Sequence, residues 1–175
     1  MPVVDLGAAV IKAVLQRRNL KPVASPFVSE LAPDALRDVG AIALEQRYQD
    51  WPEAAQPINV DEVVMGNVLQ SGQGQNTARQ AMIRAGVPKE TPAFTINKVC
   101  GSGLKAIALG AASIATGQAD VVIAGGMENM SQVPMALPKA RWGHRMEVSG
   151  VGVVTDLMVF DGLYEIFYGY HLGLT

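Results

Sequence analysis

The segment from Asp61 to Gly126 alternates short apolar runs with longer helix-forming stretches, and this alternation limits the fold more than any other feature. The apolar runs predict strands at residues 62–66, 93–99 and 120–124. The stretches between them predict helices at residues 77–85 and 101–116, each followed by a glycine. Strands that alternate with helices at this spacing form a parallel sheet with right-handed crossovers. We therefore expect an α/β fold with a mostly parallel sheet.

The composition is that of a soluble globular domain. Of the 175 residues, 49% are apolar and 17% are charged, so the chain can bury a core but carries less surface charge than usual. Its net charge of -2 argues against a nucleic-acid partner, which would require a basic face. No apolar run approaches the roughly 18 residues of a membrane helix, and the start does not resemble a signal peptide. We expect a cytoplasmic protein with no membrane partner.

Outside the alternating segment the pattern is weaker. The expected elements are an amphipathic helix over 4–20 capped by Asp5, a loop over 21–33, a helix over 34–48, and a helix over 153–167 broken near Gly162. Residues 127–150 combine methionines, prolines and basic residues without a clear period. We expect this stretch to be an irregular excursion packed on a partner.

The predicted helix over 101–116 is apolar on every side. Between Leu104 and Ala115 its only charged residue is Lys105. Such a helix must be covered on every side, whereas one sheet covers only one face. The chain shows no second sheet, so we expect another sheet or domain to cover the outer face and the chain to be incomplete.

Cys100 is the residue most suggestive of chemistry. It lies where a predicted strand ends and a helix begins, before Gly101 and Gly103. A helix N-terminus presents unpaired N–H groups and the positive end of the helix dipole, which favour a thiolate there. The two glycines let a substrate carbonyl approach the backbone N–H groups, as a nucleophile with an oxyanion site requires. The alternative is a buried structural thiol, and the sequence favours neither.

Other motifs near Cys100 are weaker. Residues 101–106 match the dinucleotide fingerprint G-x-G-x-x-A, but the candidate acid, Asp120, stands at the wrong end of the next strand. His144 and His171 are the only histidines, and a structural role is as compatible with His171 as a site role. Neither has a second ligand at helical spacing, so we expect no metal site. Gly125 and Gly126 fit a structural turn and a ligand contact equally well.

The stretch from Asn97 to Ala106 closely resembles the nucleophile signature of the thiolases, specifically the acetyl-CoA acetyltransferases. Further segments match in register over most of the chain: Met65–Gln70, Gly72–Asn76, Ala78–Gln80, Gly125–Ser131, Leu137–Gly143 and Tyr168–His171. The resemblance implies the N-terminal half of a thiolase, with buried and outer helices, over residues 1–126 and part of the loop domain over 127–175.

The resemblance also implies residue roles. Cys100 would take the acyl group as a thioester, and its own N–H would be half of an oxyanion hole. His171 would contact the acyl and pantetheine end of the substrate without acting as the base, and Leu172, where methionine is common, would line the pocket. The substrates would be acyl-CoA thioesters, with no further cofactor. The complete enzyme would be a dimer or tetramer, in which the loop domain ties dimers together.

Several features depart from the family. The second half is absent, and with it the base histidine and the second cysteine, so we expect the isolated chain to be inactive. The opening strand is absent, and residues 21–59 form an insertion or a divergent stretch. A complementary C-terminal half is therefore a candidate partner. The alternatives are a non-catalytic CoA-binding or interaction subunit, and a related condensing enzyme that acts on carrier-protein thioesters.

Overall fold

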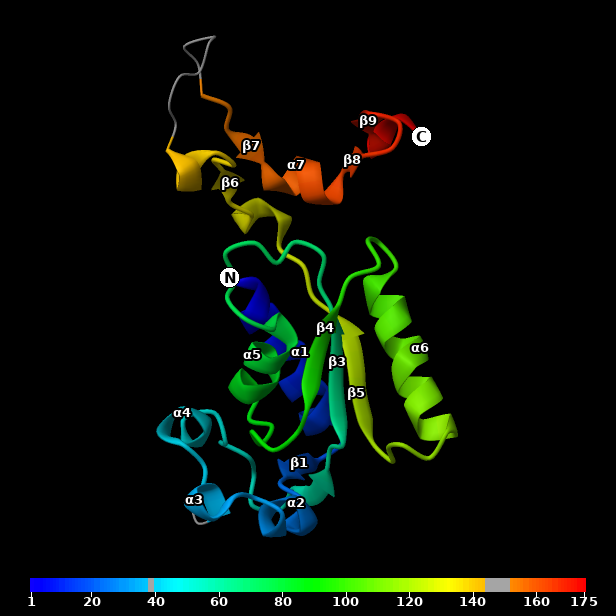
Figure 1. The fold of residues 1–175 in the computed structure, drawn as a ribbon. Coiled ribbons are helices and arrows are strands. Elements are labelled where there is room, and N and C mark those ends of the chain that lie inside the picture. The colour runs from blue at the N-terminus through cyan, green and yellow to red at the C-terminus, as the bar shows by residue number, and fades with distance from the viewer. Residues whose placement is uncertain (38–39, 144–151) are drawn as a thin grey trace.

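The computed structural model describes residues 1–37, 40–143 and 152–175, and its centre is a three-stranded parallel sheet (Figure 1). The strands are β3 (Glu62–Gly66), β4 (Ala93–Ile96) and β5 (Val122–Gly126), in the order β4-β3-β5. Met65 of β3 stands opposite Thr95 on one side and Gly125 on the other. The predicted parallel α/β arrangement is confirmed, although β4 ends earlier and β5 begins later than the apolar runs predict.

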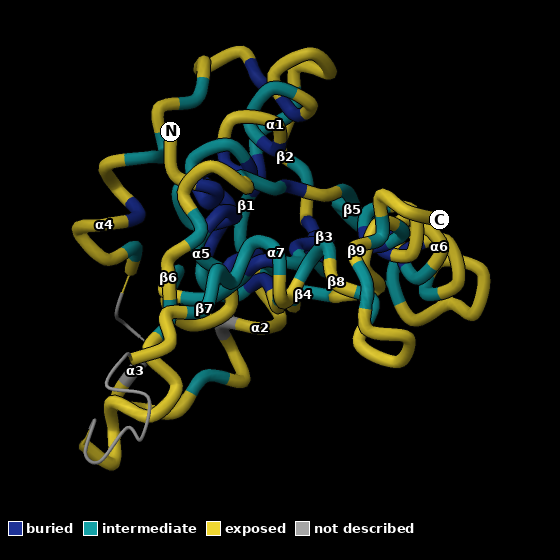
Figure 2. Tube along the Cα trace, turned by 90° about the horizontal axis from the view of Figure 1, so that it is seen from above, coloured by how far each residue is buried: buried dark blue, intermediate teal, exposed yellow. Residues whose placement is uncertain are grey.

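Helices cover both faces of this sheet. α1 (Val3–Arg17) and α5 (Thr77–Arg84) pack together on one face, and α6 (Ser102–Ala115) packs on the other (Figure 1). The buried side chains gather between the sheet and the α1–α5 pair, as the dark blue segments in Figure 2 show. α1 begins after Pro2, so the predicted cap Asp5 lies in its first turn and pairs with Arg84 of α5, 2.5 Å away.

Residues 20–59 differ from the expectation. The predicted loop begins with β1 (Leu20–Val23), which pairs in parallel with β2 (Gln56–Asn59), and it continues into α2 (Pro26–Glu30). The predicted helix over 34–48 is replaced by two short helices, α3 (Asp34–Arg37) and α4 (Ala43–Gln46). Gly40 lies between them, and the Glu45 carboxylate then accepts the N–H of the N-cap residue Ile42, so a new helix begins there.

Glu45 anchors the segment over residues 20–59 to the body. Its side chain is 2% exposed. One carboxylate oxygen accepts the Ile42 N–H at 2.7 Å, and the other accepts the Lys89 N–H at 2.7 Å. Burial alone would lower the pKa of the Lys89 ammonium, but its bond to Glu90 and the charge of Glu45 raise that pKa above its ordinary value. The Lys89 contribution to stability is therefore present at neutral pH and is lost only in alkaline solution, as the pH rises through the raised pKa.

The Glu45→Ala substitution is expected to detach this segment. It leaves two backbone N–H groups without their acceptor and removes one of the two carboxylates beside Lys89, at a local cost of about 2 to 3 kcal/mol. Limited proteolysis should cut within residues 24–50 much faster in this variant, while the sheet stays intact. The Glu30→Ala control removes an exposed glutamate of the same segment and should be cut at the wild-type rate. Equal cutting of all three proteins would contradict the anchoring role.

The C-terminal part lies beyond the carboxyl ends of the sheet strands (Figure 1). It contains η1 (Met130–Gln132), β6 (Met135–Ala136), η2 (Ala140–Trp142), β7 (Thr155–Asp156), α7 (Leu157–Gly162), β8 (Tyr164–Glu165), β9 (Tyr170–His171) and η3 (Leu172–Leu174). β6 pairs with β7 and β8 with β9, both antiparallel. The predicted helix over 153–167 is wrong in extent, since only α7 is helical, but the predicted break near Gly162 is confirmed because α7 ends there.

This part has no core of its own. Beyond Met127, none of the described side chains is buried. The division of the chain into two domains at residue 126 stays a prediction. In the described ranges, no helix is both long enough and apolar enough to span a membrane.

Candidate active site

Cys100 lies on a tight turn between β4 and α6, at the edge of the sheet where the parallel strands end. Val99, directly before it, has φ 46°, in the left-handed region that β-branched residues rarely adopt. This conformation costs about 1 to 3 kcal/mol and persists only where neighbouring contacts fix it. Asn97 Oδ1 accepts the Val99 N–H at 2.9 Å, and Ser102 Oγ donates to the Val99 carbonyl at 2.6 Å. The strained turn is therefore held by its own side chains.

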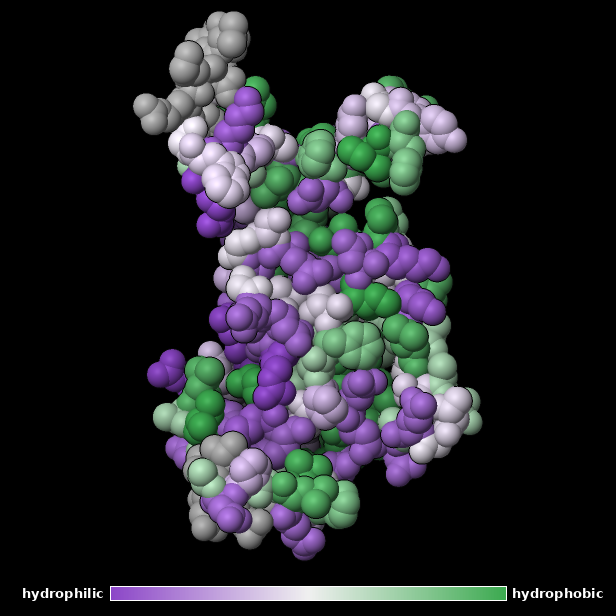
Figure 3. Space-filling view, in the orientation of Figure 1, coloured by the Kyte–Doolittle hydropathy of each residue, from purple (hydrophilic) through white to green (hydrophobic). Residues whose placement is uncertain are grey.

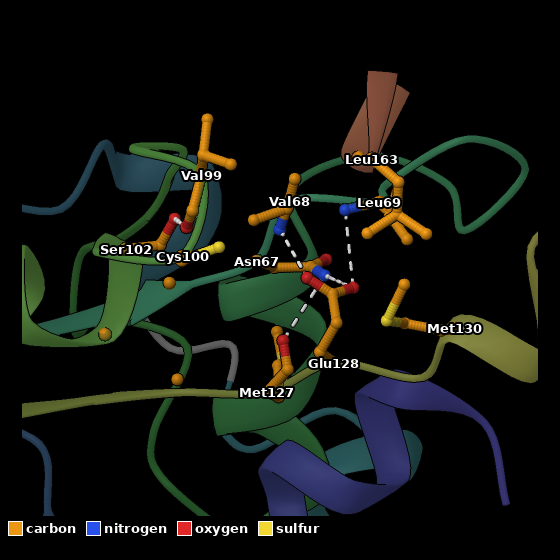
Figure 4. A pocket seen from close by; sticks show the side chains of 14 residues that line it. Asn67, Val68, Leu69, Val99, Cys100, Ser102, Met127, Glu128, Met130 and Leu163 are labelled. Atoms are coloured by element: carbon orange, nitrogen blue, oxygen red, sulfur yellow. Dashed lines mark hydrogen bonds between the residues drawn. The ribbon is translucent and has the colours of Figure 1, made fainter. Parts of the chain in front are cut away.

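The thiol of Cys100 is free and exposed. The alternative of a buried structural thiol is thereby contradicted. The sulfur opens into a cavity of about 400 Å³, a volume within the range of small-molecule sites (Figure 4). The cavity is lined by Gly66, Asn67, Val68, Leu69, Val99, Cys100, Ser102, Gly103, Gly126, Met127, Glu128, Met130, Gly162 and Leu163.

Glycines let the first turn of α6 approach the sheet beside Cys100. A Cβ on Gly66 would lie 2.5 Å from the Ser102 carbonyl carbon and 2.6 Å from the Gly103 nitrogen. A Cβ on Gly126 would lie 3.3 Å from the Gly103 Cα. The close packing of helix on sheet gives Gly126 a structural role, and because Gly126 also lines the cavity its contact with a ligand stays a prediction. The N-terminus of α6 is thus held directly at the cavity.

Two of the backbone N–H groups at this helix start are used within the turn. The Gly101 N–H donates to the Lys98 carbonyl at 3.0 Å, and the Ser102 N–H donates to the Val99 carbonyl at 3.1 Å. Neither bond involves the N–H of Cys100, whose role as an oxyanion donor stays a prediction.

Glu128 is the cavity residue that sequence reasoning missed. It follows β5 and receives three N–H donors from the loop after β3: Asn67 Nδ2 and the Val68 N–H at 2.8 Å, and the Leu69 N–H at 3.3 Å (Figure 4). The signals in the sequence are its position after a buried strand and two glycines and its place in the matching segment Gly125–Ser131. The partners lie about 60 residues earlier and could not be inferred from spacing.

The predicted substrate contacts lie outside this cavity. His171 is exposed on β9, and its Nδ1 accepts the Gly173 N–H at 3.0 Å. Leu172 does not line the cavity. Its N–H donates to the carbonyl of Leu163, which does line the cavity, at 2.7 Å. The structure does not bring either side chain to Cys100, and their substrate roles stay predictions. His144 lies outside the described residues.

In the described part of the chain, the structure does not support two other kinds of site that the sequence raised, a dinucleotide site and a metal site. Asp120 precedes β5 at its amino end, opposite the end that carries Gly126 and the Cys100 turn, and its N–H bonds to Asp61. This placement does not support a dinucleotide fingerprint, because the ribose contact requires an acid at the carboxyl end of the strand. Over the described ranges, no three His, Cys, Asp or Glu side chains are grouped so as to hold a metal ion.

The family model and the related proteins agree on one family. The family model described as "Thiolase, N-terminal domain" matches residues 22–175. The chain is 58% identical over 116 residues to an acetyl-CoA acetyltransferase of Syntrophomonas wolfei, covering 66% of this chain and 29% of that protein. It is 51% identical over 138 residues to a probable acetyl-CoA acyltransferase of Staphylococcus aureus, covering 79% of this chain and 34% of that protein. The chain therefore spans about a third of the length of these relatives.

Proposed function

The chain belongs to the thiolase family, and we propose that it carries the nucleophile of an acyltransferase that transfers acyl groups between CoA thioesters. The observation that supports this most is the exposed Cys100 thiol, which opens into a cavity at the carboxyl edge of the sheet. The relatives named as acetyl-CoA acetyltransferase or acyltransferase support an acetyl group as the acyl group. The proposal includes assembly of the complete enzyme into dimers or tetramers in the cytoplasm.

The first chemical step is formation of a thioester on Cys100. Its sulfur attacks the carbonyl carbon of acetyl-CoA, the bond from that carbon to the CoA sulfur breaks, and CoA leaves as a thiolate that takes up a proton. The Gly101 and Ser102 N–H groups at the start of α6 are already bonded within the turn, so we propose that the Cys100 N–H stabilises the oxygen that gains charge during this attack.

The second step requires a base that the described cavity does not contain. The α-carbon of a second acetyl-CoA must lose a proton before it attacks the Cys100 thioester, which releases acetoacetyl-CoA and restores the thiolate. Among the described residues that line the cavity there is no histidine. The carboxylate of Glu128 already accepts three N–H groups. We propose that the base comes from a C-terminal part, and that this chain alone is acylated without turning over.

Acylation is tested by the intact mass of the purified chain after brief incubation with acetyl-CoA. We expect the wild type to gain one acetyl group and the Cys100→Ala variant to gain none, because Cys100 is the only cysteine. Thiolysis of acetoacetyl-CoA by the chain alone should be undetectable. An unlabelled wild type, or an equally labelled Cys100→Ala variant, would refute the proposed nucleophile.

A second candidate function is that of a non-catalytic CoA-binding or interaction subunit. The observation that favours it is the exposed apolar face of α6, where Leu104 is 74% and Ile107 is 53% exposed. A partner chain would cover this face. A CoA-binding chain that forms a defined hetero-complex and is never acylated at Cys100 would favour this function over the first.

A further inference from the structure

The loop that follows β3 forms one wall of the cavity. Val68 and Leu69 of this loop line the cavity, and the Cys100 sulfur points towards the loop (Figure 4). The position of the loop therefore decides how much room an acyl group has beside the cysteine. Backbone loops hold such a position only where their polar groups are fixed by partners.

The carboxylate of Glu128 supplies that partner. Two successive backbone N–H groups, those of Val68 and Leu69, point at this carboxylate together with the side-chain amide of Asn67. Successive N–H groups that converge in this way form a concave anion site. Here an internal carboxylate fills that site and ties the loop after β3 to the end of β5. Three donors use three of the roughly four acceptor positions of this carboxylate, which gives Glu128 a holding role.

Asn67 extends the same network into the body of the protein. Its side chain is buried, with the residue 1% exposed, and its Oδ1 accepts the Thr77 hydroxyl at 2.9 Å. The hydroxyl of Thr95 lies 3.3 Å from that of Thr77 and accepts the Ala78 N–H at 2.9 Å. The loop is thus fixed from two sides, by Glu128 after β5 and by the start of α5 with β4.

We propose that Glu128 is a positioning residue, which holds the loop over 67–69 as the wall opposite Cys100 and thereby selects short acyl groups. This inference rests on the proposed acylation of Cys100. Loss of the carboxylate moves Val68 and Leu69, so the acyl group is placed less accurately, whereas the cysteine turn, held by Asn97 and Ser102, stays intact.

The Glu128→Gln substitution tests this proposal. The amide keeps one acceptor oxygen but turns an NH₂ group towards N–H donors, so at least one donor loses its partner. We expect acetyl thioester formation at saturating acetyl-CoA to fall about tenfold, because a small misplacement of reacting groups has effects of this size or larger. The preference for acetyl-CoA over hexanoyl-CoA should fall as well. Alkylation of Cys100 by iodoacetamide should keep its wild-type rate.

The matched control is Glu165→Gln. Glu165 also accepts a backbone N–H, that of Phe167 at 3.0 Å, but it is not a lining residue of the cavity. This variant should keep both the acetylation rate and the acyl preference. Wild-type acetylation and preference in Glu128→Gln would overturn the proposal, as would a loss of iodoacetamide reactivity equal to the loss of acetylation.

Amide hydrogen exchange separates this proposal from the proposed function. If acetyl-CoA does not label the wild type, the proposed function fails, but exchange at the Val68 and Leu69 amides still reports on the loop. We expect Glu128→Gln to speed exchange at these two amides about tenfold, while the amides of β3 keep their protection. Unchanged exchange at both amides would overturn the positioning role whatever the outcome of acylation.

Discussion

The Gly66→Ala substitution is expected to destabilise the chain by about 3 kcal/mol or more and to abolish thioester formation at Cys100. The added Cβ would stand 2.5 Å from the Ser102 carbonyl carbon and 2.6 Å from the Gly103 nitrogen. Both are backbone atoms, so no rotamer change relieves the contact. Gly66 itself cannot retreat easily, because its carbonyl accepts the Met127 N–H at 2.9 Å within the sheet edge. The first turn of α6, and Cys100 with it, must move.

Gly125→Ala is the matched control for this experiment. Gly125 lies opposite Met65 on the neighbouring strand, and its added Cβ would meet only the flexible Met65 side chain, at 3.6 Å from the sulfur. Urea denaturation should place this variant within about 1 kcal/mol of the wild type, and acetyl-CoA should still label it. A Gly66→Ala variant as stable and as readily labelled as Gly125→Ala would show that α6 does not pack on β3 as described.

The α/β body could be predicted because its signals are local. Each strand between Glu62 and Gly126 is a short apolar run, and each helix ends at a glycine that takes a positive φ, Gly86 or Gly117. The boundary error at β4 has a local cause as well. The strand ends at Ile96, because Asn97 and Lys98 are polar and the next residues enter the turn in which Asn97 accepts the Val99 N–H and Val99 is left-handed.

The segment over residues 20–59 could not be predicted, because its structure depends on distant partners. Leu20 pairs with Gln56, and Glu45 is fixed by Lys89 in the turn between α5 and β4. Neither contact leaves a periodic trace in the sequence. The same reason explains why only part of the candidate site could be predicted. Cys100 was found from its place before a glycine-rich helix start, whereas Glu128 has its donors some 60 residues earlier.

The outer face of α6 bears out the expectation of an uncovered apolar helix. Ala106 and Gly110 are buried against the sheet, whereas Leu104 is 74% and Ile107 is 53% exposed. Figure 3 shows hydrophobic side chains gathered over the α6 side of the body. Surfaces of this kind self-associate unless another surface covers them. The relatives are about three times as long as the part that matches this chain. We therefore expect that, in a protein of that length, the additional residues cover the exposed face of α6.

The double substitution Leu104→Lys with Ile107→Lys is expected to convert the isolated chain from a self-associating species into a monomer. The two lysines place charge on the exposed face and leave the buried face of α6 unchanged, so circular dichroism should match the wild type. Light scattering after size-exclusion chromatography measures the change. The control Val10→Lys with Val14→Lys adds the same charge to α1, where the two valines are 54% and 48% exposed. That control should still associate. A wild type that stays monomeric at high concentration would show that the α6 face needs no cover.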